Sequence, residues 1–490
     1  MAKSYESLMG SIGRAMFYRP ERQRVRELLS RESQPKLMVS GTEYPLFDIS
    51  MSGLSFLAHG ESATMSVDDE VEVLLMLHGE EIFSGQARVA RVEPGPRGGF
   101  RVGLGLVRGF LDLPEIRRRD DEKRLDDALN MGHELATTLI PAAYREVVAR
   151  IVYFFQFYRR TFDYHERRYR DEGADEEAIT GLVYRAADAM RQPWAELQRE
   201  ASRAAVECLG DRRVLLAAKE YTETLMVPCM LDIPLNNRAY LKPLGYSGDY
   251  QVMLYYYADG YEGDTVFTKA MHKLHMEHPL ANGVRTRKDL IIRQMEEEHR
   301  RVIRSRGESA TFQVTSLGCG PAREVSDFIA RNRNWTGEIM WTLIDQEEEA
   351  LSVAYRAGRR ELSTGDSRGH LELLNLSFLQ LLSEGLPLRD PGSQDLIYCT
   401  GLFDYIREER AQTLIQTMYE LVAPGGLVII GNALAPNEHF WAPEFLGDWT
   451  ILYRTRDEVF RLAGLLPENT DVDVITEPGN AYYFLMVRKK

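Results

Sequence analysis

The sequence predicts a multidomain α/β protein with three parts: a small β-barrel, a helical middle region, and a Rossmann-like doubly wound sheet that ends in a β-hairpin. Three patterns support this. Short apolar runs are separated by Gly and Pro near the N-terminus, apolar residues recur every three to four positions in the middle, and strand-like and helix-like segments alternate toward the C-terminus. The corresponding domains are residues 1–116, 117–310 and 311–490.

Composition sets the broad class of the protein. A chain of 490 residues has room for two to four domains, and 44% hydrophobic with 27% charged residues is ordinary globular composition. A net charge of −14 argues against general nucleic-acid binding. The four cysteines form no CxxC pair, which suits a reducing cytoplasm and predicts no metal site.

Neither a secretory leader nor a membrane-length apolar run is apparent, so we expect a cytoplasmic protein without stable membrane insertion. Whether it forms a homodimer is left open.

The first region contains the strand-like runs, which lie between residues 36 and 110. "KLMVSG", "VEVLLMLHG" and "FRVGLGLV" are separated by Gly, Pro and acidic turns, a spacing typical of a small barrel. The charge run "RRRDDEKR" at 117–124 is more typical of a solvated helix start than of a binding site.

From about residue 124 to 230 the sequence predicts a helical bundle or lid. Long segments such as "YREVVARIVYFFQFYRRTF" place apolar residues at helical spacing. An aromatic cluster in this segment is expected to pack in the core: Tyr153, Phe154, Phe155, Phe157 and Tyr158.

The C-terminal region reads as five β–α units followed by a hairpin. The strand-like segments are "TFQVTSLG", "EIMWTLID", "HLELLNLS", "QDLIYCT" and "GLVIIGNAL". "TDVDVITE" and "AYYFLMVRK" follow with little between them, which predicts an antiparallel strand at the edge of the sheet.

The stretch "VTSLGCGPAREV" at 314–325 joins a strand to a helix through Gly318 and Gly320. Such a turn lets a ligand approach the backbone beside the positive end of a helix. Neither the full GxGxxG pattern of dinucleotide sites nor a P-loop is present. Asp345 ends the second strand, 25 positions after Gly320, where an acid can accept hydrogen bonds from both ribose hydroxyls of a nucleoside.

With "CTGLFDYI" and the "PGG" turn of "LVAPGGLVIIGN", these segments resemble the class I S-adenosylmethionine-dependent methyltransferases over roughly residues 311–490. The resemblance implies that Gly318 and Gly320 lie against the cofactor, that Asp345 binds its ribose, and that Leu376 and Ser377 border its adenine. The alternative is a sheet of this type with an empty site.

One position departs from that family. Ser316 stands where the family often has an acid that supports the amino group of the cofactor's methionine part. We hypothesise that Asp249 supplies the missing charge.

The phrases "KPLGYSGDY" and "GVRTRKDLI" resemble a narrower bacterial group, methyltransferases related to the extracellular-factor enzymes that make hydroxypalmitic acid methyl ester. We hypothesise that Arg285 or Arg287 binds the cofactor's carboxylate or a carboxylate substrate through two hydrogen bonds. A surface or interdomain salt bridge is an equally good interpretation of each arginine.

A carboxylate acceptor is already a nucleophile and needs no general base, whereas an alcohol or amine acceptor does. Candidate catalytic residues are Tyr246, His272, His275 and Asp404. A lone histidine is more often a packing or surface residue, so no base is assigned.

Near the N-terminus, Arg22 and Arg26 form an RxxxR pattern, and Asp48, Ser50 and Gly53 form DxSxxG. Together they resemble the PilZ domain, whose ligand is cyclic di-GMP. The resemblance implies that the arginines clamp the phosphates and guanines while the acid–serine turn approaches the ligand. About ten residues separate the arginines from the first predicted strand, more than the family has, and a scaffold without ligand is the alternative.

The preferred interpretation is a cyclic di-GMP-responsive, S-adenosylmethionine-dependent methyltransferase. Its acceptor would be a small-molecule carboxylate such as a hydroxy fatty acid. The first alternative is a signalling adaptor with a catalytically idle methyltransferase domain. A protein or nucleic-acid methyltransferase is less favoured, because the chain is acidic and no [DN]PP[YF] motif follows the fourth strand.

Overall fold

The computed structural model describes residues 23–29, 33, 35–58, 65–94, 99–131, 139–365, 368–376, 392–435 and 437–490. Its contacts divide the chain into two compact units, Met1–Thr137 and Thr138–Lys490. The helices from residue 138 onward therefore share a unit with the C-terminal sheet, and the predicted division into three domains stays a prediction.

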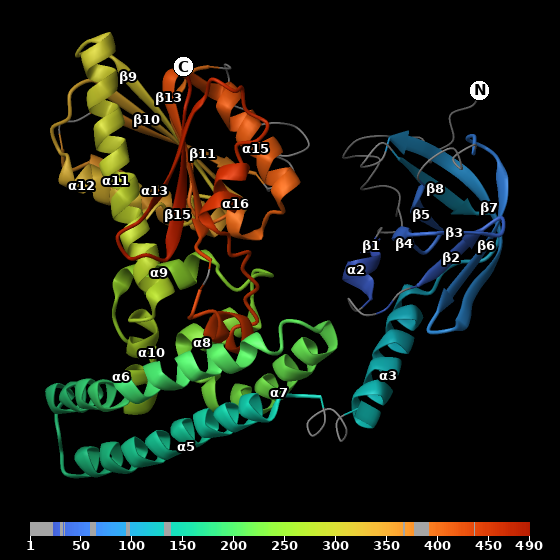
Figure 1. Cartoon of the computed structure of the whole chain (residues 1–490), viewed down its shortest axis with the longest axis horizontal. Helices are drawn as coiled ribbons and strands as arrows, with labels where there is room; N and C mark the ends of the chain where they lie inside the picture. Colours follow the sequence, from blue (N-terminus) through green and yellow to red (C-terminus); the bar gives the residue numbers. More distant parts are fainter. Residues whose placement is uncertain are drawn as a thin grey trace. The chain divides into compact units, whose positions relative to one another are not determined.

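The first unit is built on an eight-stranded antiparallel sheet in the order β1-β4-β5-β8-β7-β6-β2-β3 (Figure 1). In the described residues the end strands β1 and β3 do not pair, so the predicted closed barrel is not confirmed. The strands are β1 (Gln23–Arg24), β2 (Lys36–Val39), β3 (Thr42–Tyr44), β4 (Leu46–Ser50), β5 (Gly53–Ala58), β6 (Glu70–Leu77), β7 (Glu80–Pro94) and β8 (Phe100–Leu106).

The alternation of buried apolar residues with more exposed residues explains why this segment forms a sheet with one buried face. In β6, Val71, Val73, Leu75 and Leu77 are buried while the residues between them are more exposed, as period-two strands require. Helices α2 (Val25–Leu28) and α3 (Leu113–Met131) contribute Leu28 and Ile116 to the same core. The strand content predicted for residues 36–110 is therefore present.

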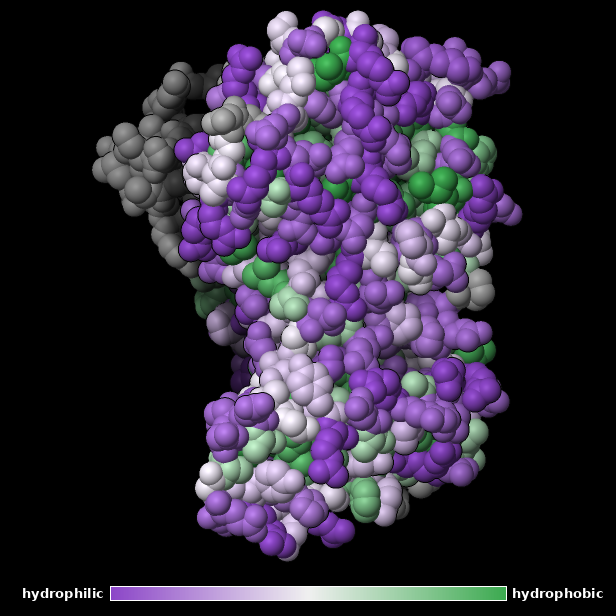
Figure 2. All heavy atoms as spheres, turned by 90° about the vertical axis from the view of Figure 1, so that its left-hand side faces the viewer, coloured by the Kyte–Doolittle hydropathy of each residue, from purple (hydrophilic) through white to green (hydrophobic). Residues whose placement is uncertain are grey.

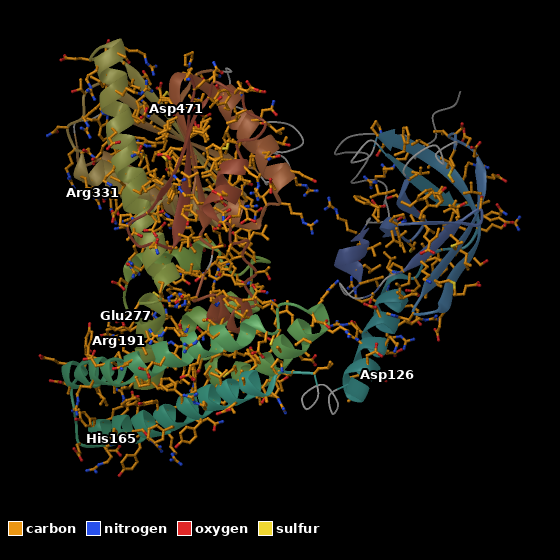
Figure 3. All side chains as sticks on the ribbon, viewed as in Figure 1. Asp126, His165, Arg191, Glu277, Arg331 and Asp471 are labelled. Atoms are coloured by element: carbon orange, nitrogen blue, oxygen red, sulfur yellow. The ribbon has the colours of Figure 1, made fainter. Side chains whose placement is uncertain are left out.

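The second unit begins with a run of helices. These are α5 (Ala142–Asp171), α6 (Glu176–Val206), α7 (Arg212–Met230), α8 (Pro234–Leu241), α9 (Tyr250–Ala258), α10 (Val266–Met276) and α11 (Pro279–Arg306). Asp175 caps α6 by accepting a hydrogen bond from the Ala178 N–H. Near the middle of α6, Arg191 binds Glu277, which follows α10, through two hydrogen bonds of 2.7 and 3.1 Å (Figure 3).

The aromatic cluster of α5 divides between the core and the surface. Phe154 and Phe155 are buried, and both rings pack on Trp194 of α6. Tyr153 and Phe157 are 66% and 40% exposed, so the expectation that the whole cluster lies in the core is wrong for these two. A helix buries only one stripe of its surface, and consecutive aromatic residues extend beyond that stripe.

The C-terminal sheet has the order β11-β10-β9-β12-β13-β15-β14. Its first five strands are parallel, and the hairpin strand β15 lies antiparallel to β13. The doubly wound sheet with a terminal hairpin is confirmed. The strands are β9 (Thr311–Leu317), β10 (Glu338–Asp345), β11 (Arg368–Asn375), β12 (Gln394–Cys399), β13 (Val422–Ala433), β14 (Asp471–Thr476) and β15 (Tyr482–Arg488).

Helices cover both faces of this sheet (Figure 1). One hydrophobic core joins the sheet to α11, α12 (Arg323–Arg331) and α13 (Glu348–Leu362), and a second joins its other face to α15 (Glu408–Leu421) and α16 (Arg456–Arg461). The face of the protein drawn in Figure 2 is mostly hydrophilic, with small separate hydrophobic areas. Among the described residues, no helix is both long and apolar enough to cross a membrane.

Candidate methyltransferase site

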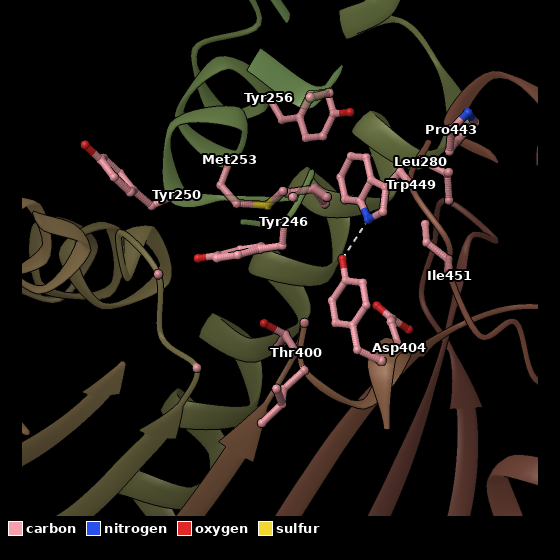
Figure 4. A pocket seen from close by; sticks show the side chains of 18 of the residues that line it. Tyr246, Tyr250, Met253, Tyr256, Leu280, Thr400, Asp404, Pro443, Trp449 and Ile451 are labelled. Carbon is pink, nitrogen blue, oxygen red and sulfur yellow. Dashed lines mark hydrogen bonds between the residues drawn. The ribbon is translucent and has the colours of Figure 1, made fainter. Parts of the chain in front are cut away.

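A cavity of about 470 Å³ opens at the carboxyl ends of β9, β10 and β12. Helices α8 to α11 form another part of its wall, and residues between 442 and 451 complete it. In Figure 4, Thr400 and Asp404 lie at the strand side, whereas Tyr256 and Trp449 lie nearer the helices. The ring nitrogen of Trp449 donates a 2.7 Å hydrogen bond to the Tyr405 hydroxyl. Ligands of open α/β sheets bind at this edge of the strands.

The glycine turn lines the cavity as predicted from its sequence. Gly318 and Gly320 both have positive φ, at 62° and 53°, which favours glycine at these positions. Ala322, which occupies the position of a third glycine, also has a positive φ of 44° and caps α12. The backbone is therefore left-handed at all three of these alternate positions, even where alanine replaces glycine.

Asp345 ends β10 beside this turn. One of its carboxylate oxygens accepts the Gly320 N–H at 2.7 Å, and the other accepts the Glu347 N–H at 2.9 Å. Burial raises the pKa of Asp345, and the carboxylate lines the cavity. Leu376 also lines the cavity, whereas Ser377 lies outside the described residues.

Ser316 is buried in β9 and does not appear in the described cavity wall. Beside it in β12 lies Tyr398, whose hydroxyl donates a 2.8 Å hydrogen bond to Glu324. Glu324 is 6% exposed, lines the cavity, and has its pKa raised by burial. The sequence reasoning missed Glu324, although an acid in the first helical turn after a glycine corner that lacks its usual acid was a usable signal.

Asp249 and Arg285 are engaged in structural contacts. The Asp249 carboxylate caps α9, accepting from the N–H groups of Gln251 and Val252, and forms a 2.7 Å ion pair with Arg238. Arg285 donates to the backbone carbonyls of Tyr256 and Met276 at 2.9 and 2.7 Å. Neither belongs to the described cavity wall. The hypothesis that Asp249 holds the cofactor stays untested, and its carboxylate already has partners.

Arg287, two positions later on α11, has different surroundings. It is 7% exposed and lines the cavity, with its guanidinium 4.6 Å from the ring centre of Tyr482 and 3.7 Å from the Met253 sulfur. Its Nε has no hydrogen-bond partner, and among the described residues no carboxylate forms an ion pair with it. A buried guanidinium without a paired anion is costly, so Arg287 is a candidate for binding an anionic ligand.

The candidate catalytic residues Tyr246, His275 and Asp404 all line the cavity. Burial raises the pKa of Tyr246, lowers the pKa of His275 to about 3, and raises the pKa of Asp404 to about 6. Asp404 lies in the short 3-10 helix Phe403–Tyr405 and accepts the Ala433 N–H at 2.7 Å. His272 is buried, and its ring accepts the Glu262 N–H, so it has a structural contact.

In the first unit, the DxSxxG residues lie in β4 and β5. Asp48 is buried and ion-paired to Arg101, and it accepts a 2.7 Å hydrogen bond from Ser55. Ser50 donates to the Gly53 carbonyl at 3.1 Å, and a side chain at Gly53 would collide with the Leu104 carbonyl. These contacts give the motif a structural role in the sheet.

The structure describes only part of the RxxxR pattern. Arg26 lies in α2, but its side chain, like all of Arg22, is outside the described residues. The strand β1 that precedes α2 pairs with β4, and Arg24 lies opposite Asp48. Residues 23 and 24, which lie between Arg22 and Arg26 in the sequence, therefore run beside the strand that carries Asp48 and Ser50.

No group of three or more His, Cys, Asp or Glu residues suited to a metal ion occurs within the described ranges. Residues 315–430 match a protein-family model described as a methyltransferase domain. No curated protein matches the chain.

Several solved structures are similar in part. Magnesium protoporphyrin IX methyltransferase from Synechocystis PCC 6803 with bound SAH has 11% identity and a TM-score of 0.34, over 50% of this chain and 96% of that one. The N-methyltransferase NodS from Bradyrhizobium japonicum WM9 has 18% identity and a TM-score of 0.26, over 40% and 86%. The apo S-adenosylmethionine-dependent methyltransferase SibL has 14% identity and a TM-score of 0.33, over 63% and 96%.

The family match covers the glycine turn, Asp345, Asp404 and the Pro-Gly-Gly segment of β13. It confirms the prediction of a methyltransferase domain in this part of the chain.

Proposed function

We propose that the protein transfers a methyl group from S-adenosylmethionine to the carboxylate of a small apolar acceptor. Arg287 is the observation that carries the choice of acceptor: it is a buried cation on the cavity wall with no anion paired to it among the described residues. A carboxylate binds a guanidinium through two charge-assisted hydrogen bonds. The apolar side chains that share the wall, among them Leu235, Leu280 and Leu446, suit an acyl chain such as that of a hydroxy fatty acid.

The residues of the cavity suit a reaction that needs little proton transfer. Bound S-adenosylmethionine would supply the methyl group on its sulfonium. The acceptor oxygen forms a bond to the methyl carbon as the carbon–sulfur bond breaks, which leaves a methyl ester and a thioether, and no proton moves. The chain has to orient the acceptor and exclude water. His275, with its pKa near 3, is a weak base, which is compatible with an acceptor that is already ionised.

Asp404 favours a second candidate, a hydroxyl acceptor. Its carboxylate lines the cavity, and burial raises its pKa to about 6, close to the range of effective general bases. Its folded pKa lies above that of a free aspartate, so acid protonates the folded enzyme first. A reaction that needs Asp404 as base would therefore slow as the pH falls below about 6.

The nature of the product separates these two acceptors. The experiment incubates the purified protein with methyl-labelled S-adenosylmethionine and a fractionated bacterial extract, then treats the labelled product with mild alkali. A carboxylate acceptor gives a methyl ester, so alkali releases labelled methanol. Alkali-stable label would overturn the carboxylate assignment and favour the hydroxyl acceptor. If S-adenosylmethionine binds but no product forms, the alternative is a signalling adaptor with a catalytically idle domain.

We further propose that the first unit binds cyclic di-GMP and regulates the enzyme. The support is the position of the basic strand β1 and helix α2 beside β4, which carries Asp48. Against a dedicated ligand role, the ion pair between Asp48 and Arg101 gives Asp48 a structural function. Regulation also requires the dinucleotide to favour one arrangement of the chain over another.

The four free cysteines are compatible with action in the cytoplasm.

Calorimetric titration of the full-length protein tests this binding. We expect cyclic di-GMP to bind, cyclic di-AMP to bind at least tenfold more weakly, and the Arg22→Ala/Arg26→Ala variant to lose cyclic di-GMP binding. Arg88→Ala, which removes an arginine exposed on β7, is the charge control and should bind normally. Absence of binding to the unaltered protein would reduce the first unit to a scaffold.

A further inference from the structure

Glu324 presents an unusual combination of burial, charge and position. Its side chain is 6% exposed and lines the cavity, four positions after Gly320. Among the described residues its one hydrogen-bonding side-chain partner is the Tyr398 hydroxyl at 2.8 Å, and no lysine or arginine forms an ion pair with it. Acids close to it in sequence are paired: Asp327, for example, binds both Lys288 and Arg323.

A buried carboxylate without a cationic partner is expensive, because burial removes its hydration and the single Tyr398 hydroxyl replaces only part of it. Burial accordingly raises the pKa of Glu324. Arg287 is near enough to lower that pKa in part, yet the two side chains do not form an ion pair. Because Glu324 lines the cavity, a cation bound there is the remaining candidate partner for its carboxylate.

Tyr398 fixes the direction of this carboxylate. It is buried in β12, directly beside Ser316 of β9, and its hydroxyl reaches from the sheet to the first turn of α12. The strand position that holds a serine is thus linked through one tyrosine to an acid on the next helix. The N-terminal end of α12, with its partial positive charge, stabilises an acid in its first turn.

We propose that Glu324 binds the ammonium group of the cofactor's amino-acid end, and that Tyr398 positions it. This assignment rests on the proposed use of S-adenosylmethionine. The ligand group is a primary ammonium, which supplies three further donors and a full positive charge to a carboxylate that has the Tyr398 hydroxyl but no paired cation among the described residues. Glu324 therefore takes over the charge that Ser316 cannot supply, and Asp249 keeps its contacts with Arg238 and α9.

The test compares two ligands that differ only in the amino group: S-adenosylhomocysteine and its deaminated analogue. Each is titrated by calorimetry into the unaltered protein and into Glu324→Gln. We expect the substitution to weaken S-adenosylhomocysteine binding by about 10- to 100-fold, the range of one charge-assisted hydrogen bond, and to leave the deaminated analogue unchanged within about twofold. Glu348→Gln, an exposed acid at the start of α13, controls for the loss of charge alone.

Glutamine keeps an oxygen for the Tyr398 hydroxyl, so Glu324→Gln without ligand should melt at or above the temperature of the unaltered protein. Tyr398→Phe tests the positioning role. It should also weaken the binding of S-adenosylhomocysteine but not of its deaminated analogue, by a smaller factor than Glu324→Gln. Equal weakening of both ligands by Glu324→Gln, or unchanged binding of S-adenosylhomocysteine, would overturn the proposal. If the unaltered protein binds neither ligand, the proposed use of S-adenosylmethionine is wrong. That result contradicts the proposed function, whereas the two results above contradict the role of Glu324.

Discussion

Asp345→Asn should lower the affinity for S-adenosylhomocysteine by about 100-fold or more. The carboxylate already accepts the Gly320 N–H and the Glu347 N–H, one on each oxygen, and the proposed ribose adds two hydroxyl donors. An asparagine keeps one oxygen and places an NH₂ group against a donor on the other side. Each lost hydrogen bond to a charged group accounts for about 1.5–3 kcal/mol, so loss of two is a large effect.

Calorimetric titration at constant salt measures this affinity. Glu348→Gln removes one nearby negative charge from an exposed position and should bind S-adenosylhomocysteine normally. An Asp345→Asn protein that binds within threefold of the unaltered protein would show that the ribose lies elsewhere. The substitution should have little effect on cyclic di-GMP binding, because Asp345 belongs to the second compact unit.

Arg287→Met should lower kcat/KM for a carboxylate acceptor by about 100-fold or more, while the affinity for S-adenosylhomocysteine stays unchanged. Methionine keeps an unbranched apolar side chain at this position and removes the guanidinium, which is the group that contacts Met253 and Tyr482. Loss of one partner of a buried charge pair costs about 2–5 kcal/mol. The charge has no described anionic partner in the protein, so its removal should not lower the melting temperature.

Arg285→Met provides a matched control on the same helix. Arg285 donates to two backbone carbonyls, so its loss should lower the melting temperature but leave KM for the acceptor unchanged. The assay is initial-rate kinetics with varied acceptor at saturating S-adenosylmethionine. If Arg287→Met instead weakens S-adenosylhomocysteine, the guanidinium binds the cofactor's own carboxylate, and the acceptor assignment fails.

The sequence was most informative where function is encoded by neighbouring residues. Gly318, Gly320 and Asp345 could be predicted because a glycine turn and an acid at the end of the next strand follow directly from the β–α order. That order also predicted the terminal hairpin, because β14 and β15 are separated by too few residues for a helix.

Roles that depend on distant partners could not be predicted. The sequence places Asp249 before the glycine turn but does not show its contacts: the carboxylate caps α9 and pairs with Arg238, and its role toward the cofactor stays a prediction. From its sequence position, Glu324 looks like an ordinary acid at the start of a helix. Only the structure shows that it is buried and that no lysine or arginine among the described residues pairs with it. In the first unit, alternation predicts each strand but not whether the two end strands meet, so closure of the barrel could not be derived.

The two sides of the cavity wall come from different parts of the chain, so they can change independently in related proteins. The glycine turn, Asp345 and Glu324 belong to the sheet and its first helix, whereas the apolar wall comes from α8 to α11 and from residues 442–451. Substitutions in the apolar wall can change the size and shape of the accepted molecule without disturbing the residues proposed to bind the cofactor's nucleoside. Related chains could therefore keep one cofactor site and acquire different acceptors through substitutions in α8 to α11 and in residues 442–451.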